Sequence, residues 1–266
     1  MSMDLTPLQV VLAILSGGVV GFALGLIGGG GSILAVPLLL YVVGLHNAHL
    51  VIGTTALAVA VNAYLNLIPH ARVGNVRWKA AIAFAIPGAI GAYIGSTLGK
   101  DMDGKALLFL FAILMLVVAV LMLKPKKNTD SSDIEQQIQV KMGKVIPAGL
   151  IVGIVSGFFG IGGGFLIVPG LLFSTGMPMI WAIGSSLFSV GTFGLTTAVN
   201  YAMSGLVDWL VVLEYVGGGI VGGVLGAMLA TRLSKSKRLL NYVFSSIIIV
   251  VAIYMLYVNF SAFHHL

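Results

Sequence analysis

The sequence is poor in charged residues and has no cysteine. Only 8% of its 266 residues are charged, whereas 59% are hydrophobic. A soluble domain carries about a quarter charged residues to cover its surface, so this deficit indicates a protein whose surface faces lipid. The absence of cysteine excludes disulfides and thiolate metal sites, and the histidines do not have metal-ligand spacing. We therefore expect no cofactor and no metal site.

Long apolar stretches take up most of the chain. A helix needs about 20 residues to cross the hydrocarbon core, and most of the stretches reach that length. The first one lacks the basic start and the small-residue cleavage site of a signal peptide. The sequence predicts an all-α integral membrane protein of the cytoplasmic (inner) membrane, with many passes in contact with the lipid bilayer. The stretches cover residues 8–43, 50–68, 78–98, 106–123, 145–175, 181–201, 209–229 and 239–260.

The sequence is also an internal duplication. GFALGLIGGGGSILAVPLLL at residues 21–40 aligns with GIVSGFFGIGGGFLIVPGLL at residues 153–172. After a slip of one residue the alignment continues, pairing Gly53-Thr54-Thr55 with Gly184-Ser185-Ser186, Gly74 with Gly205, Trp78 with Trp209, and Gly88 with Gly219. Fixed-period similarity of this kind marks a repeat architecture.

The repeat sets the domain organisation. Residues 1–123 form a first transmembrane repeat and residues 145–266 a second. The polar segment between them, residues 124–144, is predicted to be a solvent-exposed cytoplasmic linker.

The loop charges favour inverted repeats. If residues 8–43 form one broken crossing, the 14 Lys and Arg residues divide 8 to 6 between the two sides, which gives no orientation. If they form a hairpin, entering as 8–27 and returning as 32–44, each half has about five helical segments and the division is 12 to 2. That split obeys the positive-inside rule and places both termini outside. Basic residues with this distribution orient a membrane protein, so the net charge of +6 does not predict nucleic-acid binding.

The glycine-rich turns are candidate ligand sites. Irregular backbone at membrane depth persists only where protein or a water-filled cavity surrounds it. A half-helix that begins after Gly28–Gly31 and is capped by Ser32 would present free N–H groups and a positive dipole end to an anion. No Lys or Arg lies in the interior of an apolar stretch, so backbone and hydroxyl groups would have to bind the anion. The candidate glycines are Gly28, Gly29, Gly30, Gly31, Gly160, Gly162, Gly163 and Gly164.

Other glycines have a packing interpretation. Small residues let transmembrane helices approach closely. We assign this role to Gly17, Gly21, Gly88, Gly91, Gly95, Gly219, Gly222 and Gly226.

Polar residues of the following helix complete the predicted site. Hydroxyls stand at matching positions of the two halves, and Asn62 lies on one face with Thr55. These groups could contact a ligand, or they could join helices and hydrogen-bond the preceding turn. Glu214 is a carboxylate within an apolar stretch and therefore a candidate for proton coupling, although it could also reach the membrane surface. The candidate hydroxyls are those of Thr54, Thr55, Ser185 and Ser186.

These duplicated motifs resemble the TauE/SafE sulfite exporter family. The resemblance rests on the glycine run that leads to a proline, the Gly-Thr-Thr or Gly-Ser-Ser turn, and the tryptophan ahead of a GxxGxxxG helix, each present twice. It implies a secondary transporter that exports sulfite, a related sulfur oxyanion or an organosulfonate, with no catalytic residue. Inverted repeats with interrupted helices are typical of secondary transporters.

Two other classes remain as alternatives. A passive anion channel would use charged or carbonyl rings, usually in an oligomer. An intramembrane enzyme would need a nucleophile or an acid pair, and Glu214 has no evident partner in the sequence. The individual anion, the coupling ion, the direction of transport and the oligomeric state, for which a homodimer is one option, stay open.

Overall fold

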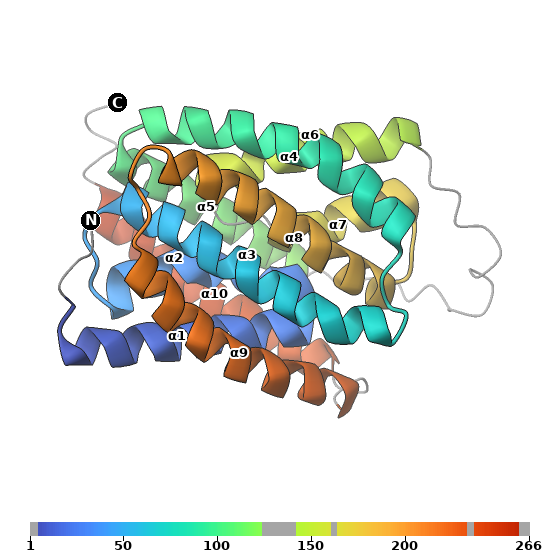
Figure 1. Ribbon diagram of the computed structural model, residues 1–266, viewed down its shortest axis with the longest axis horizontal. Helices are drawn as coiled ribbons and strands as arrows, with labels where there is room; N and C mark the ends of the chain where they lie inside the picture. Colours follow the sequence, from blue (N-terminus) through green and yellow to red (C-terminus); the bar gives the residue numbers. More distant parts are fainter. Residues whose placement is uncertain (1–4, 124–141, 161–163, 233–236, 261–266) are drawn as a thin grey trace.

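The computed structural model describes residues 5–123, 142–160, 164–232 and 237–260 (Figure 1). Helices form throughout these ranges, with no strand among them. The first half contains α1 (Pro7–Ile27), the 3-10 helix η1 (Gly28–Leu34), α2 (Ala35–Pro37), the π-helical η2 (Leu38–Val42), α3 (Ala48–Arg72), α4 (Trp78–Asp101) and α5 (Gly104–Leu123). The second half contains α6 (Met142–Phe159), α7 (Gly164–Thr175), α8 (Met179–Ala202), α9 (Trp209–Arg232) and α10 (Lys237–Asn259).

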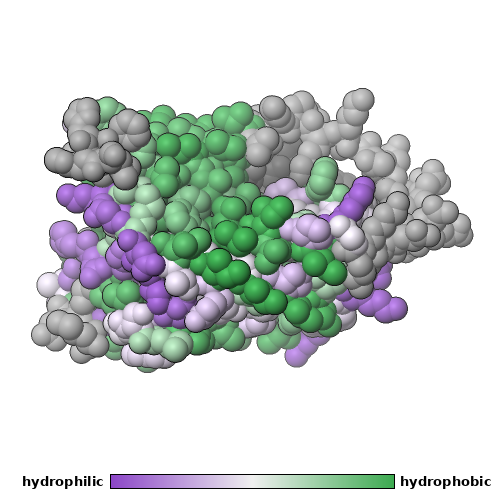
Figure 2. All heavy atoms as spheres, turned by 90° about the horizontal axis from the view of Figure 1, so that it is seen from above, coloured by the Kyte–Doolittle hydropathy of each residue, from purple (hydrophilic) through white to green (hydrophobic). Residues whose placement is uncertain are grey.

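The molecule has the surface of a membrane protein. Apolar side chains form a broad band across the face in Figure 2, and strongly hydrophilic residues lie toward its two ends. Large apolar side chains such as Ile86, Leu213 and Val221 are exposed. Because such groups are stable next to lipid, the band fits the hydrocarbon core. The segments with the length and composition to span it are Pro7–Val42, Ala48–Arg72, Trp78–Asp101, Met179–Ala202 and Trp209–Leu229.

The predicted hairpin at the start of the chain is confirmed. Gly28 ends α1 with a φ of 75°, which turns the chain back. Gly31 then packs against the backbone of Leu24 in α1. At the other end of the hairpin, the Gln9 side-chain amide donates to the carbonyl oxygen of Val43 at 3.2 Å. The returning segment therefore ends beside the point where α1 begins.

The helices of the two halves pack against each other in matching pairs. α1 lies along α9, and α4 lies along α6, while α3 packs on α8 and α5 on α10. A Cβ added at Gly21 of α1 would overlap the carbonyl oxygen of Gly219, and one at Gly153 of α6 would overlap that of Gly88. The close-packing role predicted for such glycines is confirmed. The hydrophobic core is one cluster drawn from both halves.

The first and last described helices and the end of α3 lie at opposite ends of the bundle. The first turn of α1 and the last turn of α10 lie at one end (Figure 1, left). At that end the Asn259 side-chain amide donates to the Tyr41 hydroxyl at 2.9 Å. The last turn of α3, with Arg72, and the first turn of α6 lie at the other end.

Candidate functional site

The glycine-rich turns of the two halves meet inside the molecule. Gly28 and Gly160 hold aligned positions, and both have a positive φ, 75° and 65°, which favours glycine. A Cβ at Gly29 would overlap the carbonyl oxygen of Gly164, and a Cβ at Gly164 would overlap that of Gly29. Backbone therefore touches backbone where the segments cross. Gly162 and Gly163, both predicted as site residues, lie outside the described residues.

The individual glycines of the first turn have different surroundings. A Cβ at Gly31 would come within 2.5 Å of the Leu24 backbone nitrogen. Gly30 differs, because a Cβ there would meet only Cγ2 of Ile27, at 3.3 Å. Close packing therefore requires glycine at positions 29 and 31, but it does not require glycine at position 30.

The prediction that Ser32 caps a half-helix is wrong. Ser32 is fully buried inside η1, which continues from Gly28. Its hydroxyl donates to the carbonyl oxygen of Gly29 at 3.0 Å. A serine can bond to the preceding turn in this way when the backbone around it is already helical. The glycines themselves adopt 3-10 geometry, and Gly31 packs against α1. This packing could not be predicted from the composition of the segment.

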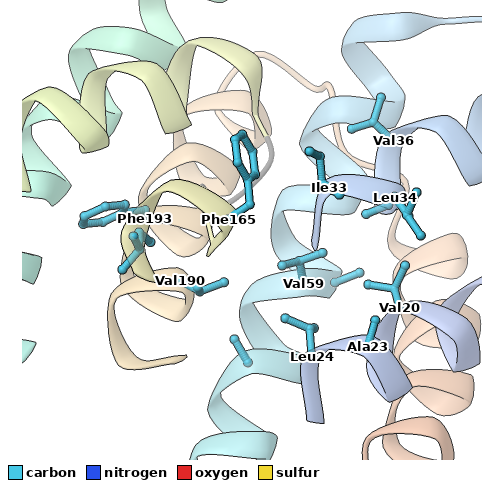
Figure 3. Packing of buried hydrophobic residues seen from close by; sticks show 14 of the residues in the cluster. Val20, Ala23, Leu24, Ile33, Leu34, Val36, Val59, Phe165, Val190 and Phe193 are labelled. Carbon is cyan, nitrogen blue, oxygen red and sulfur yellow. The ribbon is translucent and has the colours of Figure 1, made fainter. Parts of the chain in front are cut away.

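Apolar side chains surround this crossing. Ile33 and Leu34 of η1 gather with Leu24 of α1 and Val59 of α3, and Phe165 of α7 lies across from them (Figure 3). The backbone groups of the turns are thus held in a buried, largely apolar setting. Interactions with an ion are stronger in such a setting than in water.

The first hydroxyl of each Thr-Thr or Ser-Ser pair joins the two halves. Oγ1 of Thr54 accepts the backbone N–H of Asp208 at 2.9 Å. Oγ of Ser185 accepts the backbone N–H of Arg77, also at 2.9 Å. Each bond satisfies a donor just ahead of a helix of the opposite half, α9 or α4. These two hydroxyls therefore join helices, which is one of the roles considered for them from the sequence.

The second hydroxyl of each pair bonds within its own helix. Oγ1 of Thr55 donates to the carbonyl oxygens of Val51 and Ile52 at 2.8 and 3.0 Å. Oγ of Ser186 donates to the carbonyl oxygen of Ile183 at 2.7 Å. Such bonds satisfy a buried hydroxyl locally.

Asn62 is placed differently from these hydroxyls. It is fully buried in the middle of α3, and its side-chain oxygen and nitrogen find no hydrogen-bond partner in the part of the chain that the structure describes. The neighbouring Asn66 uses its amide to donate to the backbone oxygen of Asn62 at 2.9 Å. Unlike the four candidate hydroxyls, Asn62 is thus left with unused donors and acceptors within the described residues.

Other buried polar groups were missed by sequence reasoning. The hydroxyls of Ser189, Thr197, Tyr201 and Tyr215 are fully buried and have no hydrogen-bond partner among the described residues. Thr197 aligns with Asn66 in the repeat, so the alignment offered a signal for it. No such signal marked Tyr201 and Tyr215, because a tyrosine in an apolar helix is usually expected at the membrane interface.

Glu214 lies in the second turn of α9, near the end of the bundle where the chain begins. It is partly exposed, yet its Oε2 atom is buried and without a partner among the described residues. Asp208, which precedes α9, accepts the backbone N–H of Leu210 at 3.0 Å through its side chain. Asp208 therefore serves as an N-cap, whereas Glu214 has no such structural role.

No group of three potential metal ligands occurs within the described ranges. The geometry offers instead backbone groups at a crossing of interrupted helices and buried neutral polar side chains inside an apolar bundle. With its apolar spans, this bundle defines a multi-pass membrane protein.

Comparison with known proteins supplies the family. The model of the sulfite exporter TauE/SafE family matches residues 13–255, and the chain belongs to that family. A probable membrane transporter protein of Xylella fastidiosa (strain 9a5c) is 54% identical over 95% of this chain and 97% of its own length. The probable membrane transporter protein MJ0441 of Methanocaldococcus jannaschii is 30% identical over 72% of this chain and 70% of its own.

A more distant relative has the same description. The probable membrane transporter protein YunE of Bacillus subtilis is 28% identical over 84% of this chain and 89% of its own length. No solved structure matches the chain. The family and the relatives together make this chain a membrane transport protein.

Proposed function

We propose that the protein is a secondary transporter that exports sulfite, a related sulfur oxyanion or an organosulfonate across the cytoplasmic membrane. The observation that carries the proposal is the crossing of two interrupted, glycine-rich segments, where Gly29 and Gly164 touch inside the apolar bundle. Discontinuous helices near mid-membrane form the binding sites of many secondary transporters. The sulfur chemistry is supported by the family alone.

The anion is held without a basic side chain. Free backbone N–H groups near a helix start carry partial positive charge, and the turns of both halves would contribute them. Gly28–Gly31 and Gly160–Gly164 are the proposed segments. The hydroxyls of Thr54 and Ser185 hold the surrounding helices together, and those of Thr55 and Ser186 bond within their own helices. Motion of one half against the other would then open the crossing to each side in turn.

The proposed orientation follows the charged loops. The linker at residues 124–144 is cytoplasmic, both termini are extracytoplasmic, and the two halves are inverted repeats. The last turn of α3, which ends at Arg72, supports this, because it lies at the end of the bundle opposite the start of α1. Reporter fusions in the linker and after residue 266 test it. Reports from opposite sides of the membrane are expected, and reports from one side would overturn the inverted arrangement.

The transport step is tested with purified protein in proteoliposomes. Vesicles loaded with sulfite should release it, and unlabelled sulfite on the opposite side should accelerate uptake of the labelled ion. This counterflow is a property of carriers. Flux without counterflow would favour a passive channel, and absence of flux for sulfite, sulfate, thiosulfate and taurine would overturn the proposed substrate class.

A further inference from the structure

The side chain of Asn62 lies flat against α9. A Cβ added at Gly219 would overlap the Asn62 amide nitrogen and would come within 2.5 Å of its oxygen. Gly219 itself packs against Gly21 of α1. The buried amide therefore lies between α3 and α9, next to the place where α9 packs on α1, and it has no hydrogen-bond partner among the described residues.

A second unused group stands one turn away on the same helix. Tyr215 precedes Gly219 by one helical turn and shares its face of α9. Its ring is fully buried, and its hydroxyl has no hydrogen-bond partner within the described residues. Burying a hydroxyl and an amide with nothing to bond is costly, so groups of this kind are expected to have a partner that the polypeptide does not supply.

The equivalent contact between α4 and α8 has apolar residues at these two positions. In the alignment of the halves, Phe193 corresponds to Asn62 and Phe84 corresponds to Tyr215. The rings of Phe84 and Phe193 stack with their centroids 6.2 Å apart and an interplanar angle of 19°. Phe193 lies against Gly88, as Asn62 lies against Gly219. The contact between α4 and α8 thus holds aromatic rings at the positions where the equivalent contact between α9 and α3 holds polar groups.

The residues around Asn62 and Tyr215 limit the charge of an ion that could bind between them. α1 has no charged residue, and the basic residues Arg72 and Arg232 stand at the last positions of α3 and α9. The cost of burying an ion rises with the square of its charge, and neutral donors offset only part of it. The Asn62 amide also offers an acceptor beside its donors, which suits a ligand with a proton to give.

We infer that Asn62 and Tyr215 form the side-chain part of a single anion site, where α3 meets α9 beside α1, and that the site takes a singly charged, protonated oxyanion such as hydrogensulfite. This inference rests on the proposed function and deepens it. The site is one per chain, because its counterpart is closed by Phe84 and Phe193. The amide and the hydroxyl donate to the anion, and the amide oxygen accepts its proton.

Two substitutions test the site in purified full-length protein. Asn62→Leu and Tyr215→Phe remove the polar atoms with little change in volume, and the second places the residue that already stands at the aligned position 84. Tyr201→Phe is the matched control, since Tyr201 is another fully buried tyrosine with an unpartnered hydroxyl among the described residues. Binding is measured by calorimetry at mildly acidic pH, where sulfite is mainly hydrogensulfite and sulfate is a dianion.

Both variants should bind hydrogensulfite roughly ten- to a hundredfold more weakly than the wild type, because each loses a hydrogen bond to a charged ligand. Their melting temperatures without ligand should equal or exceed that of the wild type, since an unsatisfied buried group has been removed. A residue that only supports the fold would show the opposite pattern. Tyr201→Phe should keep wild-type affinity, and sulfate should bind the wild type more weakly than hydrogensulfite does.

The possible failures are distinguishable. Wild-type affinity in both variants would overturn this site while leaving the transporter proposal intact. Sulfate binding as tight as that of hydrogensulfite would overturn the assigned charge. A wild-type protein that binds neither ion and transports no sulfur anion would overturn the proposed function, and this inference with it.

Discussion

The two equivalent helix junctions of the molecule, α1 with α9 and α6 with α4, are packed alike but differ in the side chains beside them. α1 lies on α9 through Gly21 and Gly219, and α6 lies on α4 through Gly153 and Gly88. Over the first contact lies the amide of Asn62, and over the second lies the ring of Phe193. The backbone packing is thus common to both junctions. The side chains differ, and this difference allows a duplicated chain to have a single binding site.

The hydroxyl contacts between the halves are the same on both sides of the repeat, unlike the side chains at the two helix junctions. Thr54 accepts a backbone N–H from the second half, and Ser185 accepts one from the first, at the same distance. Equal roles at aligned positions indicate that both hydroxyls stabilise the assembly. The comparison therefore separates residues expected to change folding from residues expected to change binding.

The largest effect is expected at the paired glycines. Gly21→Ala and Gly153→Ala each place a Cβ on the carbonyl oxygen of a partner helix. Because backbone faces backbone, neither helix can yield by turning a side chain, and each variant should lose about 3 kcal/mol of stability. Thermal melts of the purified variants measure this, with equal losses expected in the two halves.

Gly18→Ala is the control on the same helix. A Cβ at Gly18 would lie 3.6 Å from the carbonyl oxygen of Gly218, an ordinary contact. This variant should melt within a few degrees of the wild type. If Gly153→Ala lost little stability while Gly21→Ala lost much, the two helix pairs would not be equivalent.

A smaller and again matched effect is expected at the hydroxyls between the halves. Thr54→Val and Ser185→Ala each leave a backbone N–H without its acceptor, at Asp208 or Arg77. A buried donor left unpaired costs about 1–3 kcal/mol. Thermal melts should show similar losses for both. A variant that keeps its stability but loses affinity for sulfite would instead make that hydroxyl a ligand contact.

Much of this scaffold could be predicted from the sequence. The glycine spacing disclosed the duplication, and the loop charges selected the hairpin that the Gln9–Val43 contact confirms. The role of Ser32 could not be predicted, because it depends on η1 packing against α1. Tyr215 was missed for a similar reason: burial of its hydroxyl follows from how α9 sits on α1 and α3, which no local pattern encodes.

The glycine turn allows a finer test of packing against binding. Gly30→Ala adds a Cβ that meets only the Ile27 side chain at 3.3 Å, so stability should change by less than about 1 kcal/mol. Gly29→Ala should be far more damaging, because its Cβ would overlap Gly164. If the turn lines the anion site, Gly30→Ala should weaken sulfite binding while the melting temperature stays near that of the wild type. Unchanged affinity in calorimetry would remove Gly30 from the site.

The smallest effect on stability, and the sharpest asymmetry, is expected at Glu214. Its aligned residue in the first half is Ala83, so the carboxylate has no counterpart. Unlike Asp208, it caps no helix, and its Oε2 atom is buried without a partner among the described residues. Glu214→Gln removes the titrating proton and keeps the shape, so the free energy of unfolding should change by less than about 0.5 kcal/mol.

Transport should respond differently. A membrane-embedded carboxyl that carries a coupling proton makes flux depend on pH, and glutamine cannot exchange that proton. In proteoliposomes, sulfite flux through Glu214→Gln should lose the pH dependence of the wild type, while sulfite affinity in calorimetry stays within about twofold. Glu214→Asp, which retains a carboxyl group, should restore part of the dependence. A wild-type pH profile in the glutamine variant would show that Glu214 carries no proton, and the coupling group would then have to be sought elsewhere in the bundle.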